Sequence, residues 1–360
     1  MPWARRLPWE AVPRLHPFTA HIPGLTNKEG IVYDVVGVGN ALVDMIALVE
    51  DSFLEVNQMM KGSMALVETD RALHLSLAVG ESTRTSGGSG ANTLAGIASL
   101  GGHVAFIGKV ADDEFGQVFS ADMAAVGVDF HSGASDASTP TGRCIIAVTP
   151  DAERTMNTYL GISTALAFSD LDASIVASGA ILYLEGYLFD RDDAKDAFRQ
   201  AAALAHEHGR VVSLTLSDAF CVDRHRADFQ ALVRDEIDLL FANEDELKSL
   251  YETVDFDEAI ELLRRDCHIA AVTRSEKGSV IVTRDDIHAV PAAAVDQVID
   301  TTGAGDLFAA GFLRGLTRGL DLTSCARMGA IAAAEVISHV GPRPLVQLST
   351  LLPADLQERL

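Results

Sequence analysis

The feature that most constrains the fold is a repeated alternation of short β-branched runs with segments of helical periodicity. Residues 31–39 (IVYDVVGVG) form one such run, and residues 91–101 (ANTLAGIASLG) then carry apolar side chains at helical spacing. The same order recurs from residue 180 to residue 284. It predicts an α/β fold with a mostly parallel central sheet flanked by helices on both faces. Ligands of such sheets bind where the strands end, so candidate site residues are expected there.

Three segments depart from this alternation. Residues 45–69 and 140–160, the latter with the strand-like GRCIIAVT, are expected to form a small β lid over the site. Residues 1–30 contain both tryptophans and lack hydrophobic periodicity, which predicts a disordered N-terminal extension. The folded domain is therefore expected to span residues 31–352.

The net charge of -23 excludes a general nucleic-acid surface, which needs clustered lysine and arginine, but still allows a local site for a small anion. No apolar run approaches the ~18 residues that cross a bilayer, so no membrane partner is expected. The four cysteines lack C-x-x-C spacing, which favours reduced thiols over zinc or disulfides. These features predict a cytoplasmic protein, either a monomer or a homodimer.

Two common nucleotide motifs are incomplete. The segment GVGNAL at 37–42 has Leu42 where the dinucleotide fingerprint needs its third glycine. The Gly108-Lys109 pair lacks the spacing of a P-loop and the hydroxyl residue that follows its lysine. Neither a Rossmann dehydrogenase nor a Walker ATPase is expected.

The segment 300–315 (DTTGAGDLFAAGFLRG) carries the strongest chemical signal. Gly303, Ala304 and Gly305 let backbone N–H groups converge at the start of an apolar helix, where they form an anion hole. Asp306 in the same place would accept a proton from a hydroxyl while the amides hold a transferring phosphoryl group. The alternative is that Asp306 only caps the helix.

This segment is accompanied by 86–102 (SGGSGANTLAGIASLGG), 106–116 (FIGKVADDEFG) and 241–246 (FANEDE). Together they resemble the signatures of the ribokinase-like (PfkB) small-molecule kinases, with matches in order from about residue 31 to residue 341. The resemblance implies a ribokinase-like fold and phosphoryl transfer from ATP to an alcohol group. It also implies that Asp306 is the catalytic base.

The same resemblance suggests the ATP side of the site. Asn243 and Glu246 follow a predicted strand, and N-x-x-E spacing places both on one face of a first helical turn. The family match implies that they place Mg²⁺ through water, although an N-cap with its capping-box glutamate has the same spacing. Residues 273–278 (TRSEKG) resemble a nucleotide-binding turn of the family, which implies ATP contacts from Thr273, Ser275 and Gly278. Ser275 stands where the family has a glycine.

Arg154, in the predicted lid, resembles a family arginine that reaches the phosphates when the lid closes. The alternative is a solvated surface arginine. Family members often bind a monovalent cation such as K⁺ near the first aspartate of the signature, and Asp300 and Thr302 are the local candidates.

The acceptor is suggested by GNALVD at 39–44, which resembles the G-N-P-L-L-D of adenosine kinases, where the two polar residues flank a ribose. Asn40 and Asp44 are therefore candidate substrate residues, and an aspartate can accept hydrogen bonds from both vicinal hydroxyls. Gly88 and Asn92 join them. The alternatives are a plain turn at Gly88 and an N-cap at Asn92.

Apolar residues near the same site, Leu42, Tyr187 and Phe220, favour a nucleoside because a purine needs flat apolar walls. The alternative for the two aromatic residues is an ordinary core position. We therefore predict ATP-dependent phosphorylation of the ribose 5′-hydroxyl of a purine nucleoside, adenosine first. A kinase of the same fold acting on ribose or fructose, and a non-catalytic nucleoside sensor, remain the alternatives.

Overall fold

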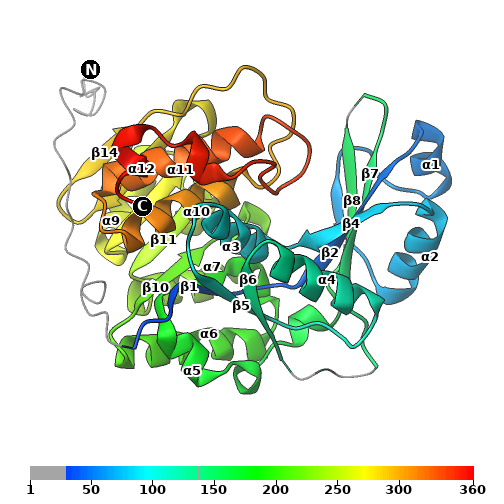
Figure 1. Ribbon diagram of the computed structural model, residues 1–360, viewed down its shortest axis with the longest axis horizontal. Helices are drawn as coiled ribbons and strands as arrows, with labels where there is room; N and C mark the ends of the chain where they lie inside the picture. Colours follow the sequence, from blue (N-terminus) through cyan, green and yellow to red (C-terminus); the bar gives the residue numbers. More distant parts are fainter. Residues whose placement is uncertain (1–29, 134, 136–137, 152) are drawn as a thin grey trace.

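The computed structural model describes residues 30–133, 135, 138–151 and 153–360, which form two β-sheets with helices (Figure 1). The predicted N-terminal extension lies outside the described residues, apart from Gly30. Within the described residues the larger sheet has nine strands: β1 (Tyr33–Val38), β5 (Val104–Gly108), β6 (Val128–Ser132), β9 (Gly179–Glu185), β10 (Val211–Thr215), β11 (Leu239–Asn243), β12 (Ile269–Thr273), β13 (Ser279–Thr283) and β14 (Ile287–Val290).

The strand order of this sheet is β14-β13-β12-β11-β10-β9-β1-β5-β6. The strands from β12 to β6 are parallel, and β13 and β14 add an antiparallel edge. Strands β5 and β9 are buried along their whole length, as expected for parallel strands covered on both faces. The predicted mostly parallel sheet is confirmed.

Helices cover both faces of the larger sheet, as the sequence predicts. One face packs against α3 (Ser89–Ser99), α4 (Glu114–Ala125), α10 (Ala304–Thr317) and α11 (Leu322–Val336). The other face packs against α5 (Ala173–Ser178), α6 (Asp192–Glu207), α7 (Ala219–Asp235), α8 (Glu244–Tyr251) and α9 (Phe256–Asp266). Each face has its own apolar core, so the sheet is held from both sides.

The smaller sheet, called the lid sheet below, stands to one side of the larger one (Figure 1). Its strands, in the order β3-β8-β7-β2-β4, are β3 (Met64–Leu66), β8 (Arg154–Tyr159), β7 (Gly142–Val148), β2 (Leu42–Leu48) and β4 (Thr83–Gly87). The segments predicted as a lid, 45–69 and 140–160, both supply strands to it. The sequence did not predict the short helix α1 (Asp51–Val56) within the first segment, or the contribution of β4.

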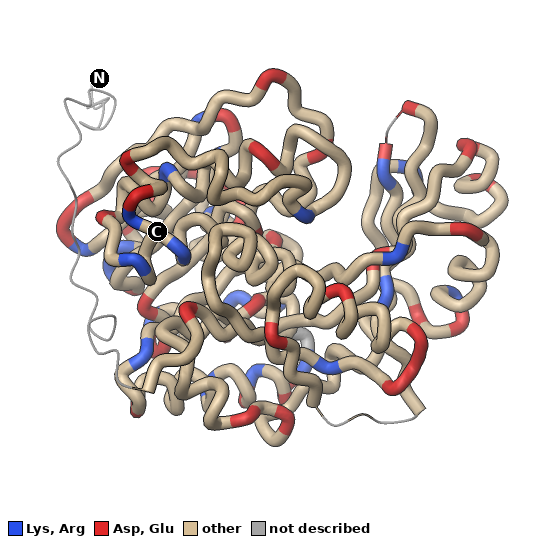
Figure 2. Tube along the Cα trace, in the orientation of Figure 1, with Lys and Arg blue, Asp and Glu red and all other residues tan. Residues whose placement is uncertain are grey.

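Helix α1 and helix α2 (Thr69–Val79) pack on one face of the lid sheet, and Figure 1 shows them on its outer side. All four cysteines are buried thiols. In the described part of the chain, no helix is both long and apolar enough to cross a membrane. The larger sheet and the helices that cover it are called the larger body below. Acidic positions are spread over both the larger body and the lid sheet (Figure 2).

Candidate active site

The predicted base, Asp306, lies in the first turn of α10 and contacts α3. Its carboxylate accepts hydrogen bonds from Ser89 Oγ at 2.6 Å and from Asn92 Nδ2 at 3.0 Å. Gly303 is the N-cap of α10 with φ of 80°, a backbone conformation that favours glycine. The Asp306 side chain therefore bonds to the neighbouring helix and does not cap its own. Burial raises its pKa, although the two donors act to lower it.

The N-terminus of α10 opens onto unfilled space. A Cβ added at Gly305 would meet no atom within 4 Å, whereas one added at Gly303 would lie 2.8 Å from Cα of Pro342. The first N–H groups of a helix have no acceptor within the helix, so they can bind an anion. Ala304 N already donates to Thr301 O at 3.2 Å, so a phosphoryl group at this helix end would share that N–H and bind to those of Gly303 and Gly305, directly before Asp306.

The glycine-rich segment brings the predicted substrate residues together. Gly88, with φ of 98°, packs against the backbone oxygen of Asn40, where a Cβ would not fit. Gly87 packs in the same way against the carboxylate of Asp44. Gly88 is therefore more than a plain turn, because its missing side chain lets α3 approach Asn40.

Asn40 is held by a carboxylate that the sequence analysis missed. Asn40 donates its backbone N–H to Glu185 Oε2 at 3.2 Å and its Nδ2 to Glu185 Oε1 at 3.1 Å. Gly90 N donates to Glu185 at 2.7 Å, and Ser163 Oγ donates to Asn40 Oδ1 at 2.9 Å. Burial raises the pKa of Glu185 to about 7. The available signal was an acidic residue at the end of the buried strand β9.

Asp44 lies on β2 of the lid sheet and is nearly buried. No described residue donates a hydrogen bond to its carboxylate. Burial raises its pKa to about 6, against the lowering effect of the positive charges on Arg343 and Arg154. Its capacity to accept hydrogen bonds is therefore open to a ligand.

Arg154 reaches from β8 of the lid sheet to the larger body. Its Nη1 forms an ion pair with Asp300 and donates to Thr302 Oγ1 at 3.2 Å. Asp300 also accepts Thr302 N at 3.0 Å and Gly341 N at 2.9 Å. Burial acts to raise the pKa of Asp300, but these bonds and the arginine hold it below its usual value. Arg154 is thus a nearly buried residue and not a solvated one.

The ATP-side residues lie where β11 and β12 end side by side, since Asn243 pairs with Thr273. Asn243 N donates to Glu246 Oε2 at 3.0 Å, Asn243 Nδ2 donates to Oε1 at 2.6 Å, and Glu246 N donates back to Asn243 Oδ1 at 2.8 Å. This is a complete capping box at the start of α8. Burial raises the pKa of Glu246 to about 7. The described residues contain no cluster of three or more His, Cys, Asp or Glu suited to a metal ion.

The turn after β12 contains two residues with positive φ, Ser275 and Gly278. Ser275 has φ of 51°, so it adopts the left-handed conformation that a glycine would take more easily. Gly278, with φ of 87°, packs against the backbone of Val290 on β14. The turn therefore tolerates the departure from the family pattern at Ser275.

The three residues predicted to contact a base differ in their positions. Leu42 is buried at the start of β2. Tyr187 is largely buried, donates its hydroxyl to Ser217 O at 3.3 Å, and has a pKa raised by burial. Phe220 is 62% exposed in the first turn of α7, with the Arg224 guanidinium 4.5 Å from its ring centre. Phe220 is therefore not an ordinary core aromatic residue.

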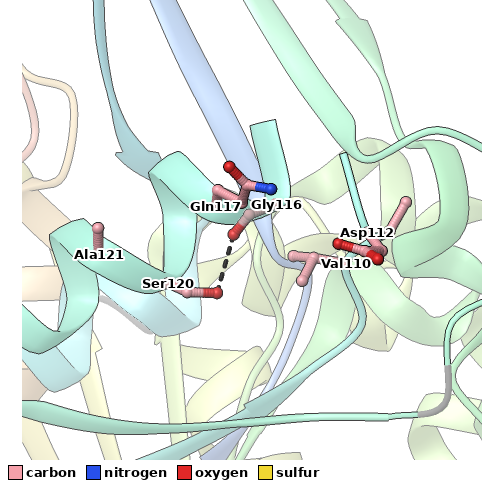
Figure 3. Close-up of a pocket in the computed structure, with 7 residues that line it drawn as sticks. Val110, Asp112, Gly116, Gln117, Ser120 and Ala121 are labelled. Carbon is pink, nitrogen blue, oxygen red and sulfur yellow. Dashed lines mark hydrogen bonds between the residues drawn. The ribbon is translucent and has the colours of Figure 1, made fainter. Parts of the chain in front are cut away.

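A separate hollow lies beside the N-terminal half of α4 (Figure 3). It is lined by Val110, Ala111, Asp112, Gly116, Gln117, Ser120 and Ala121. None of the predicted site residues lines it, and its lining offers one carboxylate and no cationic side chain to a phosphate. The hollow is therefore distinct from the site described above.

A buried carboxylate beside an open helix N-terminus, at the edge of a mostly parallel sheet, is an arrangement suited to small-molecule kinases with a ribokinase-like fold. The model of the pfkB family carbohydrate kinases matches residues 35–348. The chain belongs to this family. Membership makes it a phosphotransferase that uses ATP, usually with a divalent metal, and it confirms the predicted fold and enzyme class.

Among relatives, rice fructokinase-1 is 31% identical over 64% of this chain and 73% of its own length. Adenosine kinase 2 of Arabidopsis thaliana is 24% identical over 88% of this chain and 96% of its own length. Two solved structures are more similar. A probable sugar kinase from Rhizobium etli has 46% identity, a TM-score of 0.83, and coverage of 91% of this chain and 99% of its own. Adenosine kinase from Sinorhizobium meliloti has 52% identity, a TM-score of 0.81, and coverage of 88% and 98%.

Proposed function

We propose that this kinase transfers the γ-phosphoryl group of ATP to the ribose 5′-hydroxyl of a purine nucleoside, with adenosine as the first candidate. One observation carries the nucleoside assignment. The face of the lid sheet that presents Asp44 carries a cluster of apolar side chains, and α1 and α2 cover the opposite face. A hydroxyl-binding carboxylate next to an apolar wall suits a ligand with a sugar at one end and a flat base at the other.

The strand register defines this apolar face. Asp44 pairs with Cys144 across β2 and β7, and side chains two residues further along each strand share the same face. The apolar residues on this face, on strands β2, β7, β8 and β3, are Ile46, Leu48, Ile146, Val148, Met156, Met64 and Leu66. The same register also places polar residues on it, Thr158 and Arg154 on β8 and Thr83 and Thr85 on β4. Leu48 is 88% exposed and Leu66 is 47% exposed. This open apolar surface replaces Phe220 as the stronger candidate for the wall that contacts the base.

The relatives support two acceptors. Adenosine kinase from Sinorhizobium meliloti is 52% identical to this chain, which favours a nucleoside. The rice fructokinase and the probable sugar kinase from Rhizobium etli favour a sugar kinase as the second candidate. The oriented Asp306 and the open N-terminus of α10 argue against a non-catalytic sensor, which needs neither.

In the proposed reaction Asp306 accepts the proton of the attacking hydroxyl, in the position that Ser89 and Asn92 fix. Asn40 and Asp44 hold the ribose hydroxyls, and the N–H groups at Gly303, Ala304 and Gly305 stabilise charge on the transferring group.

Arg154 adds a positive charge where the lid sheet contacts the segment that precedes α10. Asp300 and Thr302, the candidates for K⁺, bond to this arginine, so in the proposed reaction they place Arg154.

The divalent metal suits the ATP side only through its water shell. Both carboxylate oxygens of Glu246 already accept hydrogen bonds from Asn243, although each oxygen keeps a lone pair for water. When bound, Mg²⁺ would neutralise charge on the phosphates of ATP. Asn243 and Glu246 would orient the water molecules that surround it.

The test is a coupled assay of ADP release with adenosine, inosine, guanosine, ribose and fructose as acceptors. We expect the highest kcat/KM with adenosine, and the Asp306→Asn variant serves as the inactive control. Preference for ribose or fructose would contradict the nucleoside assignment and leave the kinase class intact. Nucleoside binding without ADP release from any acceptor would support a sensor instead.

A further inference from the structure

Arg343 fastens the segment after α11 to the lid sheet. Its Nη2 donates to the backbone oxygen of Ser86 at 3.1 Å and to Ser86 Oγ at 2.9 Å, across 257 residues of sequence. The same nitrogen lies 3.7 Å from Met123 Sδ. Ser86 in turn donates its N–H and its hydroxyl to Asp122 Oδ2 at 2.8 Å and 2.5 Å. The C-terminal segment, β4 and α4 are therefore joined at one arginine.

The position of Ser86 places Arg343 beside the substrate site. Ser86 is followed by Gly87, which packs against the carboxylate of Asp44. Two residues further on, Ser89 bonds to Asp306. Arg343 thus bonds to the same short segment that contacts both of the carboxylates assigned to substrate binding and catalysis. None of the motifs in the sequence pointed to this arginine.

The charge balance of the site leaves a role for this arginine. The titratable groups that act electrostatically on Asp306 and Asp44 come from several elements: Arg154, Arg343, Glu185, Glu246, Cys144, Tyr183 and Tyr187. Together with Asp44 and Asp306 themselves, the carboxylates number four against two arginines, and Arg154 is already paired with Asp300. Nε and Nη1 of Arg343 are buried and have no hydrogen-bond partner among the described residues.

A buried guanidinium with open N–H groups is costly unless nearby negative charge compensates for it. We propose that Arg343 is a positioning residue of the substrate site, whose positive charge balances Asp44 and Asp306 and keeps both carboxylates ready to accept a hydroxyl. The negative groups that act on Arg343 are Asp122 on α4, then Asp44 and Asp306. The charge of Arg343 acts to lower the pKa of Asp44 and of Asp306, which agrees with this role. The inference rests on the proposed function in taking Asp306 as the base.

The test compares Arg343→Met, which removes the charge but keeps an extended side chain, with Arg343→Lys, which keeps the charge. The measurement is kcat/KM as a function of pH, with whichever acceptor the wild-type enzyme phosphorylates. The acid limb is the pH range in which kcat/KM falls as the carboxylates take up protons. We expect Arg343→Met to move it upward by about one pH unit or more, because the positive charge near the two carboxylates is lost. The loss of activity should approach roughly tenfold at pH 5, be about twofold at pH 7 and disappear by pH 9. Arg343→Lys should keep the limb within about half a unit of its wild-type position.

Two further variants separate the effect of the Arg343 charge from the effect of its hydrogen bonds to Ser86. Ser86→Ala removes one bond to Arg343 but keeps its charge, so its acid limb should stay in place. Arg327→Met, on the exposed surface of α11, makes the same change in net charge far from the carboxylates and should also leave the limb unchanged. If Arg343→Met lowers kcat/KM by the same factor at every pH, or if Ser86→Ala moves the limb equally, the proposal is overturned.

If Arg343→Met does not fold, the other two variants still test the charge role. An acid limb that stays in place in both Arg343→Lys and Ser86→Ala supports it. An acid limb that shifts in either variant contradicts it. Failure of the wild-type enzyme to phosphorylate any acceptor would contradict the proposed function and is observed before any variant is compared.

Discussion

The two buried carboxylates of the site, Asp306 and Asp44, differ in how the protein holds them. Asp306 accepts hydrogen bonds from Ser89 and Asn92, whereas no described residue donates to Asp44. The protein therefore fixes the orientation of the predicted base before a substrate arrives. The second carboxylate keeps its capacity to accept hydrogen bonds, which suits the substrate-binding role proposed for it.

The surroundings of the two carboxylates also differ, since Asp306 stands on a more deeply buried element than Asp44. Asp306 stands on α10, whose residues from Leu307 to Leu316 are all buried in the core of the larger body. Asp44 stands on the lid sheet, whose apolar clusters are small and whose open face exposes Leu48. The transfer end of the site is thus expected to be rigid and the recognition end adjustable.

The largest effect is expected from Asp306→Asn, which should lower kcat by about 10²–10⁴-fold because the attacking hydroxyl loses its proton acceptor. Nucleoside affinity, measured by calorimetry, should change little. Asp285→Asn, in an exposed turn, is the matched control and should retain wild-type kcat. A kcat close to wild type in Asp306→Asn would remove this residue from the role of base.

Asp44→Asn should act on binding instead. Loss of charge-assisted hydrogen bonds to the substrate hydroxyls is expected to raise KM by roughly 10–100-fold, with a smaller change in kcat. Steady-state kinetics of the two variants side by side tests the comparison directly. If Asp44→Asn mainly lowers kcat, the assignment of Asp44 to substrate binding is wrong.

The pH profile of the wild-type enzyme should show an acid limb near pH 6. Asp44 has its pKa raised to about 6, and the pKa of Asp306 is raised as well, so both carboxylates take up protons earlier than free aspartate does. Because the ionised forms bind and react, kcat/KM should fall by roughly tenfold for each pH unit below the limb. A flat profile between pH 5 and pH 7 would be inconsistent with these surroundings.

The smallest effects are expected from two glycine variants. Gly87→Ala places a Cβ against the Asp44 carboxylate and should raise KM by about tenfold, since small displacements in a site are costly. Gly305→Ala meets no protein atom, so it should leave the melting temperature unchanged or higher while it obstructs the phosphoryl group and lowers kcat. If both variants changed KM by the same factor, the proposed difference between the substrate-binding end and the phosphoryl-transfer end of the site would be contradicted.

Much of the fold and part of the site could be predicted from the sequence. Alternating β-branched runs and helical periodicity gave the mostly parallel sheet, because both patterns depend on residues close together in the chain. Motifs with fixed local spacing, such as the segment around Asp306 and the pair Asn243 and Glu246, were found for the same reason. The register of the lid strands, which places the exposed Leu48 on the same face as Asp44, could not be found in this way.

The sequence by itself determined the architecture, the family and the segment in which phosphoryl transfer is expected. Only the tertiary structure decided which groups surround it: Glu185 meets Asn40 across 145 residues, and Arg343 meets Ser86 across 257. A single Glu or Arg carries no periodicity or spacing that marks its partner. Such contacts arise only when the sheet, the helices and the C-terminal segment pack together and bring these charges to the same buried place.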